Sequence, residues 1–240
     1  MKIIFYLLLC INLFGDTLHV ASAKWPPYIE KKEKQISGIS VDIIKEIAKR
    51  TGDKIDIRIY PVKRLQRLLK YKKIDINFAD AKEWNSKEEQ KKYVFSEPYL
   101  YVNEYIYSTP NFNKVITKVS DLYGEKVGIT KGYYYEILEK DFNNKKILKY
   151  EITTNKGLLK LLLRDKFSLA IFDDKLLDYL LKGKKSDMKL IQKMEVSSVA
   201  LRLKILNSKK NILPRINKAI ESMKKDHTID AILAKYKTSK

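Results

Sequence analysis

One segment in the second half of the chain has residue types that suit the binding of an anion. Thr130, Lys131, Gly132 and Tyr133 link an apolar run to a segment with helical spacing. Backbone N–H groups at the start of a helix attract carboxylate or phosphate groups, and glycine lets the backbone approach a ligand closely. Lys131 adds a positive charge. We therefore expect all four residues to contact a ligand.

Two neighbouring carboxylates stand at a similar junction further along the chain. Asp173 ends the apolar segment 168–172, and Asp174 opens the next helical segment. An Asp at such a junction caps the helix, and Asp174 is the simpler candidate for this cap. Asp173 is left open to two roles, ligand contact or capping. A metal site needs clustered His, Cys or carboxylate ligands. The Asp173-Asp174 pair is too small a cluster, so we expect no metal and no cofactor.

Aromatic and basic side chains follow the segments predicted as strands in the first half of the chain. Trp25 and Tyr28 come after the first strand, where aromatic walls could stack on apolar or cationic parts of a ligand. Core packing is the alternative role for both. Arg64 opens a helix and could hold an anion, or could simply be an exposed basic residue. Asp80 and Trp84 lie in the loop after a later strand and could shape the same pocket.

Few residues could support catalysis. The chain has two histidines, His19 in a predicted strand and His227 at a helix boundary, and neither is placed as an obvious general acid. Glu104 or Asp173 could serve instead. The single cysteine, Cys10, lies in an N-terminal apolar run, so its removal would exclude disulfides and thiol chemistry. Binding without chemistry is therefore the expected function, with an enzyme as the alternative.

The chain of 240 residues has a formal charge of +20, which raises the question of nucleic-acid binding. The lysines are scattered through every segment, and no basic stripe interleaved with aromatic residues stands out. We interpret them as solvated lysines on helix faces and expect no nucleic-acid partner. The positive field would still attract anionic ligands or an anionic membrane surface.

The N-terminus has the pattern of a secretory signal. Lys2 is followed by a mostly apolar run from Ile3 to Phe14, shorter than the roughly 20 residues that span a membrane. We expect a cleavable signal over residues 1–15, with cleavage near Gly15. Cleavage after Ala21-Ser22-Ala23 would destroy a strand predicted over residues 17–22. The mature protein is expected in the periplasm.

Apolar periodicity predicts alternating strands and helices. Strands are expected at 17–22, 54–60, 74–78, 125–130, 147–152, 168–172 and 199–205, and helices at 39–51, 62–72, 133–141, 156–165, 174–182, 211–224 and 229–236. Such alternation implies mainly parallel sheets covered on both faces. The same order of alternating strands and helices returns after the first hundred residues. We therefore predict an α/β clamshell of two lobes joined by two hinge crossings. One lobe takes residues 16–105 and 199–240, and the other takes residues 106–198. Ligands bind beyond the carboxyl ends of such strands, which is the cleft.

An ordered set of short motifs matches a known family. The motifs are Trp25-Pro26-Pro27-Tyr28, Gly38-Ile39 before Val41-Asp42, Pro61 to Arg64, Ile74-Asp75, Phe95-Ser96-Glu97-Pro98-Tyr99, Ser120-Asp121-Leu122, Val127-Gly128-Ile129, Asn217-Lys218-Ala219 and Ile232 to Tyr236. In this order they resemble bacterial extracellular solute-binding proteins of family 3, the polar amino-acid-binding group. The resemblance covers nearly the whole mature chain and implies a type II periplasmic-binding-protein fold.

The resemblance also implies a function. It suggests a monomer that captures a small polar or anionic, amino-acid-like molecule by hinge closure and delivers it to an ABC permease in the inner membrane. Family members can instead act as sensory modules, and a periplasmic cyclohexadienyl dehydratase is similar to the family. Asp173 resembles the acid that meets the ligand amino group. Where the family presents an arginine for the ligand carboxylate, this chain has Gln90, which carries no charge.

Overall fold

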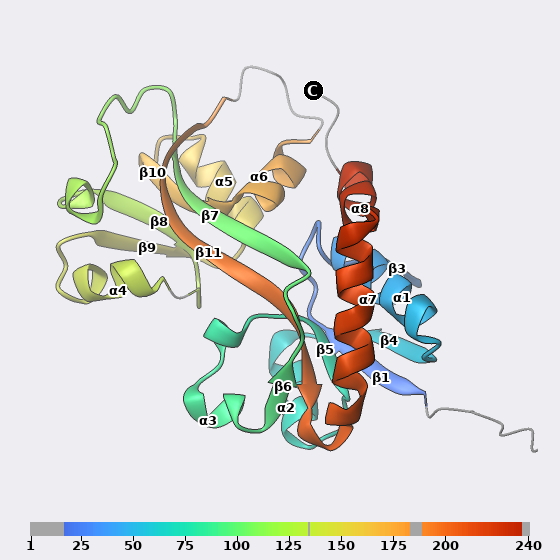
Figure 1. The fold of residues 1–240 in the computed structure, drawn as a ribbon. Coiled ribbons are helices and arrows are strands. Elements are labelled where there is room, and N and C mark those ends of the chain that lie inside the picture. Colours follow the sequence, from blue (N-terminus) through green and yellow to red (C-terminus); the bar gives the residue numbers. More distant parts are fainter. Residues whose placement is uncertain (1–16, 134, 183–188, 237–240) are drawn as a thin grey trace, which may run out of the picture.

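The fold is α/β and two-lobed, as the sequence predicts (Figure 1). The structure is a computed structural model that describes residues 17–133, 135–182 and 189–236. The signal peptide expected over residues 1–15 lies outside the described residues. No helix in the described ranges combines the length and the apolar character needed to cross a membrane.

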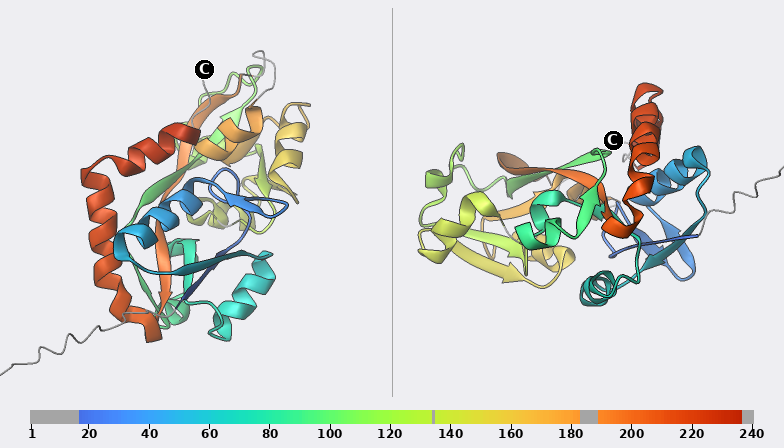
Figure 2. Two further views of the ribbon diagram at one scale, coloured as in Figure 1. Left: turned by 90° about the vertical axis from the view of Figure 1, so that its right-hand side faces the viewer. Right: turned by 60° about the horizontal axis from the view of Figure 1, so that its bottom comes forward.

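The first lobe is built on a sheet whose central strands are parallel. Its strands are β1 (Leu18–Ser22), β4 (Ile55–Ile59), β5 (Ile76–Asp80) and β6 (Tyr93–Phe95) with the last part of β11 (Ile191–Leu206). Its helices are α1 (Ile39–Thr51), α2 (Val62–Lys70), α3 (Lys87–Gln90), α7 (Leu213–Lys225) and α8 (Thr228–Tyr236). Strand β1 lies between β4 and β5 and pairs in parallel with both. Helices α7 and α8 pack beside α1 on one side of this lobe (Figure 2).

The second lobe repeats the parallel arrangement. Its strands are β8 (Lys126–Thr130), β9 (Leu148–Ile152) and β10 (Leu169–Asp173), and its helices are α4 (Glu136–Asn143), α5 (Asn155–Leu162) and α6 (Asp174–Leu181). Alternate residues of β10 enter separate apolar clusters: Ile171 packs with Leu138, whereas Phe172 packs with Leu158 and Leu176. Both faces of β10 are therefore buried, as expected for a parallel strand between helices, whereas the edge strand β9 is mostly exposed.

Two long antiparallel strands connect the lobes. Strand β7 (Leu100–Ser108) pairs with β11 on one side and with β10 on the other. Figure 1 shows β7 and β11 side by side as they run from one lobe into the other. The register of this pair is irregular between Gln192 and Ser197. Strand β11 has 16 residues, so it extends well before the start predicted at residue 199.

Several further elements differ from the prediction, and among them β6, β7 and α3 were not predicted. The helix predicted to start at residue 133 is α4, which begins at Glu136, so Tyr133 lies in the loop before it. A short hairpin of β2 (Glu30–Lys32) and β3 (Gln35–Ser37) follows the first strand and was not predicted. The other helices start and end within a few residues of the predicted bounds.

Candidate functional site

The two lobes meet where their parallel strands end. Tyr28, in the loop after β1, donates a hydrogen bond from its phenol to Asp173 Oδ1, at the end of β10, over 3.0 Å. Both residues are buried. A second bond between the lobes runs from the Tyr179 phenol in α6 to Glu30 Oε1 in β2, over 2.8 Å. The carboxyl ends of β1 and β10 thus face one another, which is the position where ligands bind in open α/β sheets.

Asp173 also caps α6. Its Oδ1 accepts a bond of 2.8 Å from the backbone N–H of Leu176, so Asp173 is the N-cap and the assignment of this cap to Asp174 is wrong. Capping and a contact across the cleft are therefore compatible. Burial raises the pKa of Asp173 to about 7, against the opposing hydrogen bonds from Leu176 and Tyr28. The carboxyl can gain or lose a proton near neutral pH.

A second carboxyl lies directly beside Asp173 on the next strand. Glu104 of β7 pairs with Asp173 of β10 and, on its other side, with Ser197 of β11. Directly opposed residues of antiparallel strands point to the same face of the sheet, with Cβ atoms about 5 Å apart. The Ser197 hydroxyl and the Tyr135 phenol donate hydrogen bonds to the Glu104 carboxylate. Burial nevertheless raises the pKa of Glu104 above its ordinary value.

Three aromatic rings line the first-lobe side of this region. Trp25 lies 4.3 Å from Tyr28 and 5.7 Å from Trp84 between ring centroids. The Trp25 Nε1–H is buried and has no hydrogen-bond partner among the described residues. An unpaired buried donor is costly, and an acceptor atom on a ligand would satisfy it. The structure therefore brings Trp25, Tyr28 and Trp84 together, as proposed from the sequence.

The loop after β8 lies on the second-lobe side. Thr130 is buried and its hydroxyl donates to Asn155 Oδ1 at the start of α5, over 2.6 Å. Gly132 has a φ of 85°, which favours glycine, although a Cβ at this position would meet no other atom. Lys131 and Tyr133 are exposed. Because α4 begins only at Glu136, this loop does not offer a helix N-terminus to an anion, and that part of the prediction is wrong.

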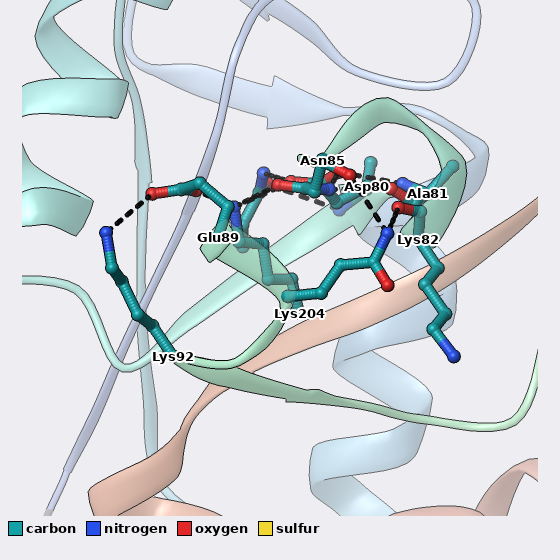
Figure 3. A network of polar contacts seen from close by, with 10 residues as sticks. Asp80, Ala81, Lys82, Asn85, Glu89, Lys92 and Lys204 are labelled. Atoms are coloured by element: carbon teal, nitrogen blue, oxygen red, sulfur yellow. Dashed lines mark hydrogen bonds and ion pairs between the residues drawn. The ribbon is translucent and has the colours of Figure 1, made fainter. Parts of the chain in front are cut away.

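Asp80 belongs to an internal network at the end of β5 (Figure 3). Its carboxylate accepts hydrogen bonds from Asn77, Asn85 and the backbone of Ala81 over 2.7 to 2.8 Å. Lys204 of β11 is buried beside it, with its ammonium 3.8 Å from Asp80 Oδ2 and 3.1 Å from Glu89 Oε2. Burial raises the pKa of Asp80, and Lys204 opposes this rise. All partners of this network lie in the first lobe.

Gln90, the last residue of α3, bonds back to the loop between β5 and α3. Its side-chain amide donates to the carbonyl oxygens of Lys82 and Asn85 over 3.0 and 2.9 Å. The two bonds hold the loop between β5 and α3 in one conformation. Gln90 therefore positions Trp84, which lies within that loop, rather than presenting its amide to the region near Asp173.

Arg64 lies apart from this group. It is exposed in the first turn of α2, and its guanidinium carbon is 5.0 Å from the centroid of the Tyr60 ring. A cavity of about 420 Å³ opens nearby, at the end of β4. The residues that line it are Ala23, Lys24, Lys31, Glu33, Ile59, Tyr60, Pro61 and Val62. The structure does not bring Arg64 to Asp173.

Three residues of the site were missed from the sequence. Tyr135 and Ser197 hold Glu104, and Asn155 holds Thr130. Ser197 is recognisable only from the register of β11 against β7. That register pairs residues that are 93 positions apart in the sequence. The sequence around Asn155 could have indicated a helix start, since Thr154-Asn155 precedes an apolar helical pattern. In the structure Thr154 is the N-cap of α5.

Comparison with known proteins identifies the family. Residues 18–239 match the bacterial extracellular solute-binding proteins, family 3. The arginine-binding extracellular protein ArtP of Bacillus subtilis (strain 168) is 27% identical over 154 residues, which cover 64% of this chain and 59% of ArtP. A protein of Campylobacter jejuni subsp. jejuni serotype O:2 named "Probable histidine-binding protein" is 26% identical over 225 residues, 92% of this chain and 84% of the relative.

A solved structure agrees with this assignment. An ancestral arginine-binding protein bound to arginine superimposes with a TM-score of 0.73 at 25% identity, covering 92% of this chain and 98% of the ancestral protein. The match therefore includes both lobes and the strands between them. The chain belongs to the bacterial extracellular solute-binding proteins of family 3.

Proposed function

We propose that the mature protein is a periplasmic receptor that closes its two lobes over a small amino-acid-like molecule and delivers it to an ABC importer. Residues 1–15 act as the secretory signal. Residues 16–105 and 199–240 form one lobe, residues 106–198 form the other, and the protein works as a monomer.

The observation that carries this proposal is the hydrogen bond between Tyr28 and Asp173. It joins the carboxyl ends of parallel strands from both lobes at one point, among aromatic rings and next to a second carboxyl. A ligand held there would contact both lobes at once, and contact with both lobes is what favours a closed state over an open one. The family membership supports the same mechanism, and the names of its relatives make arginine and histidine the first ligands to test.

A thermal-shift screen tests the proposal. The purified protein is refolded to remove any ligand that co-purified, then heated with amino acids, small carboxylates, phosphorylated compounds, sugars and short peptides. A ligand at about 100 times its dissociation constant adds roughly 2.7 kcal/mol to the free energy of unfolding, which is a visible rise in Tm. The expected result is a clear rise with at least one amino-acid-like solute. No rise with any compound of the panel would contradict the proposal.

An enzyme on the same scaffold is the second candidate, because burial raises the pKa of Asp173 to about 7. A general acid works best when its pKa is near the working pH. Incubation with a cyclohexadienyl acid and detection of the aromatic product tests this candidate. Turnover that disappears in Asp173→Asn would support an enzyme, and bound ligand recovered unchanged would support a receptor.

A further inference from the structure

The charges around Asp173 are unbalanced. Asp173 and Glu104 lie side by side on one face of the sheet, and the charge of Glu104 contributes to the raised pKa of Asp173. The groups that act on them are the Tyr28 phenol, the Leu176 N–H, the Ser197 hydroxyl, the Tyr135 phenol and the further carboxylate of Asp174. None of these is a cation. Among the described residues no Lys or Arg forms an ion pair with either carboxyl, and a buried carboxylate without a counter-charge is costly.

The described cations of the first lobe do not reach Asp173 or Glu104. Arg202 of β11 is half-buried; its guanidinium donates to the Ser96 carbonyl oxygen over 2.7 Å, and its Nε–H is buried without a partner among the described residues. Within the described ranges, Lys204 is the one Lys or Arg that is buried, and its ammonium is already bound by Asn85, Glu89 and Asp80. Lys131, after β8, is exposed to water. Neither Lys204 nor Arg202 forms a hydrogen bond or ion pair with Asp173 or Glu104 among the described residues. A negative group on a ligand held at these two carboxyls would therefore meet neutral donors, such as the Trp25 indole.

We propose that this site selects small cations, amines or guanidines, whose positive charge is shared by Asp173 and Glu104, and that binding does not require a carboxylate on the ligand. The inference rests on the proposed receptor function and names its ligand class. A guanidinium or ammonium donates hydrogen bonds to both carboxylates at once. The Tyr28 ring is joined to Asp173 by its hydrogen bond, Trp25 packs against Tyr28, and Trp84 packs against Trp25. Aromatic faces of this kind attract cations.

Matched pairs of ligands test the inference by isothermal titration calorimetry on the refolded protein. Agmatine is arginine without its carboxylate, histamine is histidine without it, and citrulline keeps the shape of arginine without the positive charge. We expect at least one amine to bind within about 3-fold of its parent amino acid, and citrulline to bind about 10-fold or more weaker than arginine. The inference is overturned if both parent amino acids bind about 10-fold tighter than their amines, or if citrulline binds as well as arginine.

The same titrations separate this inference from the receptor function. Tight binding of a neutral or acidic solute, with none of the cations bound, would leave the receptor function standing and overturn the cation class. If neither the cations nor any other solute of the panel bound, both the cation class and the receptor function would be rejected.

A charge-neutral substitution at the second carboxyl supplies an independent test. Glu104→Gln keeps the size of the side chain and should weaken agmatine, or whichever cation binds, by about 10-fold or more, because a charged hydrogen bond becomes a neutral one. Glu195→Gln, an exposed glutamate on β11, is the matched control and should change the affinity by less than about 2-fold. Equal affinities in the two variants would remove Glu104 from the site. Circular dichroism confirms that both variants are folded.

Discussion

Asp173 caps a helix of its own lobe and contacts the other lobe with one side chain. One of its oxygens receives both the Leu176 N–H at the start of α6 and the Tyr28 phenol from the opposite lobe. The carboxyl is buried near Glu104 and Asp174, and among the described residues no Lys or Arg forms an ion pair with Asp173 or Glu104. Burial therefore raises its pKa to about 7.

The raised pKa of Asp173 makes the protein less stable as pH rises. The folded state binds a proton at Asp173 more tightly than the unfolded state, whose Asp titrates near pH 4. This stabilising contribution is complete below about pH 4 and is lost as pH rises through about 7. Asp173→Asn removes the titration and keeps an N-cap. Between pH 5 and pH 8, we expect its free energy of unfolding to gain about 2–4 kcal/mol relative to the unsubstituted protein.

Urea unfolding at the two pH values measures this difference. Asp174→Asn is the matched control, because Asp174 is less buried and pairs with Lys175 over 3.1 Å. We expect the control to follow the unsubstituted protein. The prediction is wrong if Asp173→Asn and the unsubstituted protein lose stability equally between pH 5 and pH 8.

Among the secondary-structure elements, β11 holds the loop between β5 and α3 through one side chain, Lys204. Its ammonium reaches Asp80 at the end of β5, Asn85 in the loop and Glu89 in α3, and lies 4.3 Å from the centroid of the Tyr93 ring. The buried ammonium on the neighbouring strand thus holds the loop together with the Gln90 and Asn85 hydrogen bonds. The loop carries Trp84, so the network also places one wall of the site.

Replacing Lys204 by Met should destabilise the first lobe. Met keeps the apolar stem but leaves the buried Asp80 without its counter-charge, a loss of about 3–5 kcal/mol in the free energy of unfolding. The double variant Asp80→Asn with Lys204→Met removes both charges and should recover more than half of that loss. Urea unfolding of the three proteins measures the effect. Equal losses in the single and double variants would show that the ion pair is not the cause.

Local patterns predicted most of the elements, because helices and buried parallel strands are encoded by nearby residues. The segment Ile55–Ile59 alternates in sequence and is β4, and Ile39–Thr51 is α1 as expected. The early part of β11 was missed because Ile191 to Ser198 is mostly polar and becomes a strand by pairing with β7. The same long-range pairing sets Glu104 between Asp173 and Ser197. The sequence could therefore indicate the cleft and Asp173, but not the second carboxyl as its neighbour.

For the molecule as a whole, the hinge is the pair of strands that joins the lobes. Strands β7 and β11 are hydrogen-bonded over most of their shared length, with register irregularities between Gln192 and Ser197. Two hydrogen bonds between the lobes, Tyr28 to Asp173 and Tyr179 to Glu30, hold them together. Each neutral or charged bond of this kind contributes about 0.5–3 kcal/mol. Removing such bonds by substitution should therefore shift the equilibrium between the open and closed states of the proposed receptor.

The double variant Tyr28→Phe with Tyr179→Phe should favour the open form. It removes both hydroxyls and keeps both rings, so the closed state loses about 1–3 kcal/mol, a shift of about 5–150-fold in the equilibrium. Small-angle scattering should show a larger radius of gyration for this variant without ligand, and compaction when a saturating ligand is added. Tyr123→Phe is the control, since its phenol bonds to Asp141 within one lobe. Identical radii for all three proteins, with and without ligand, would rule out hinge closure held by these two bonds.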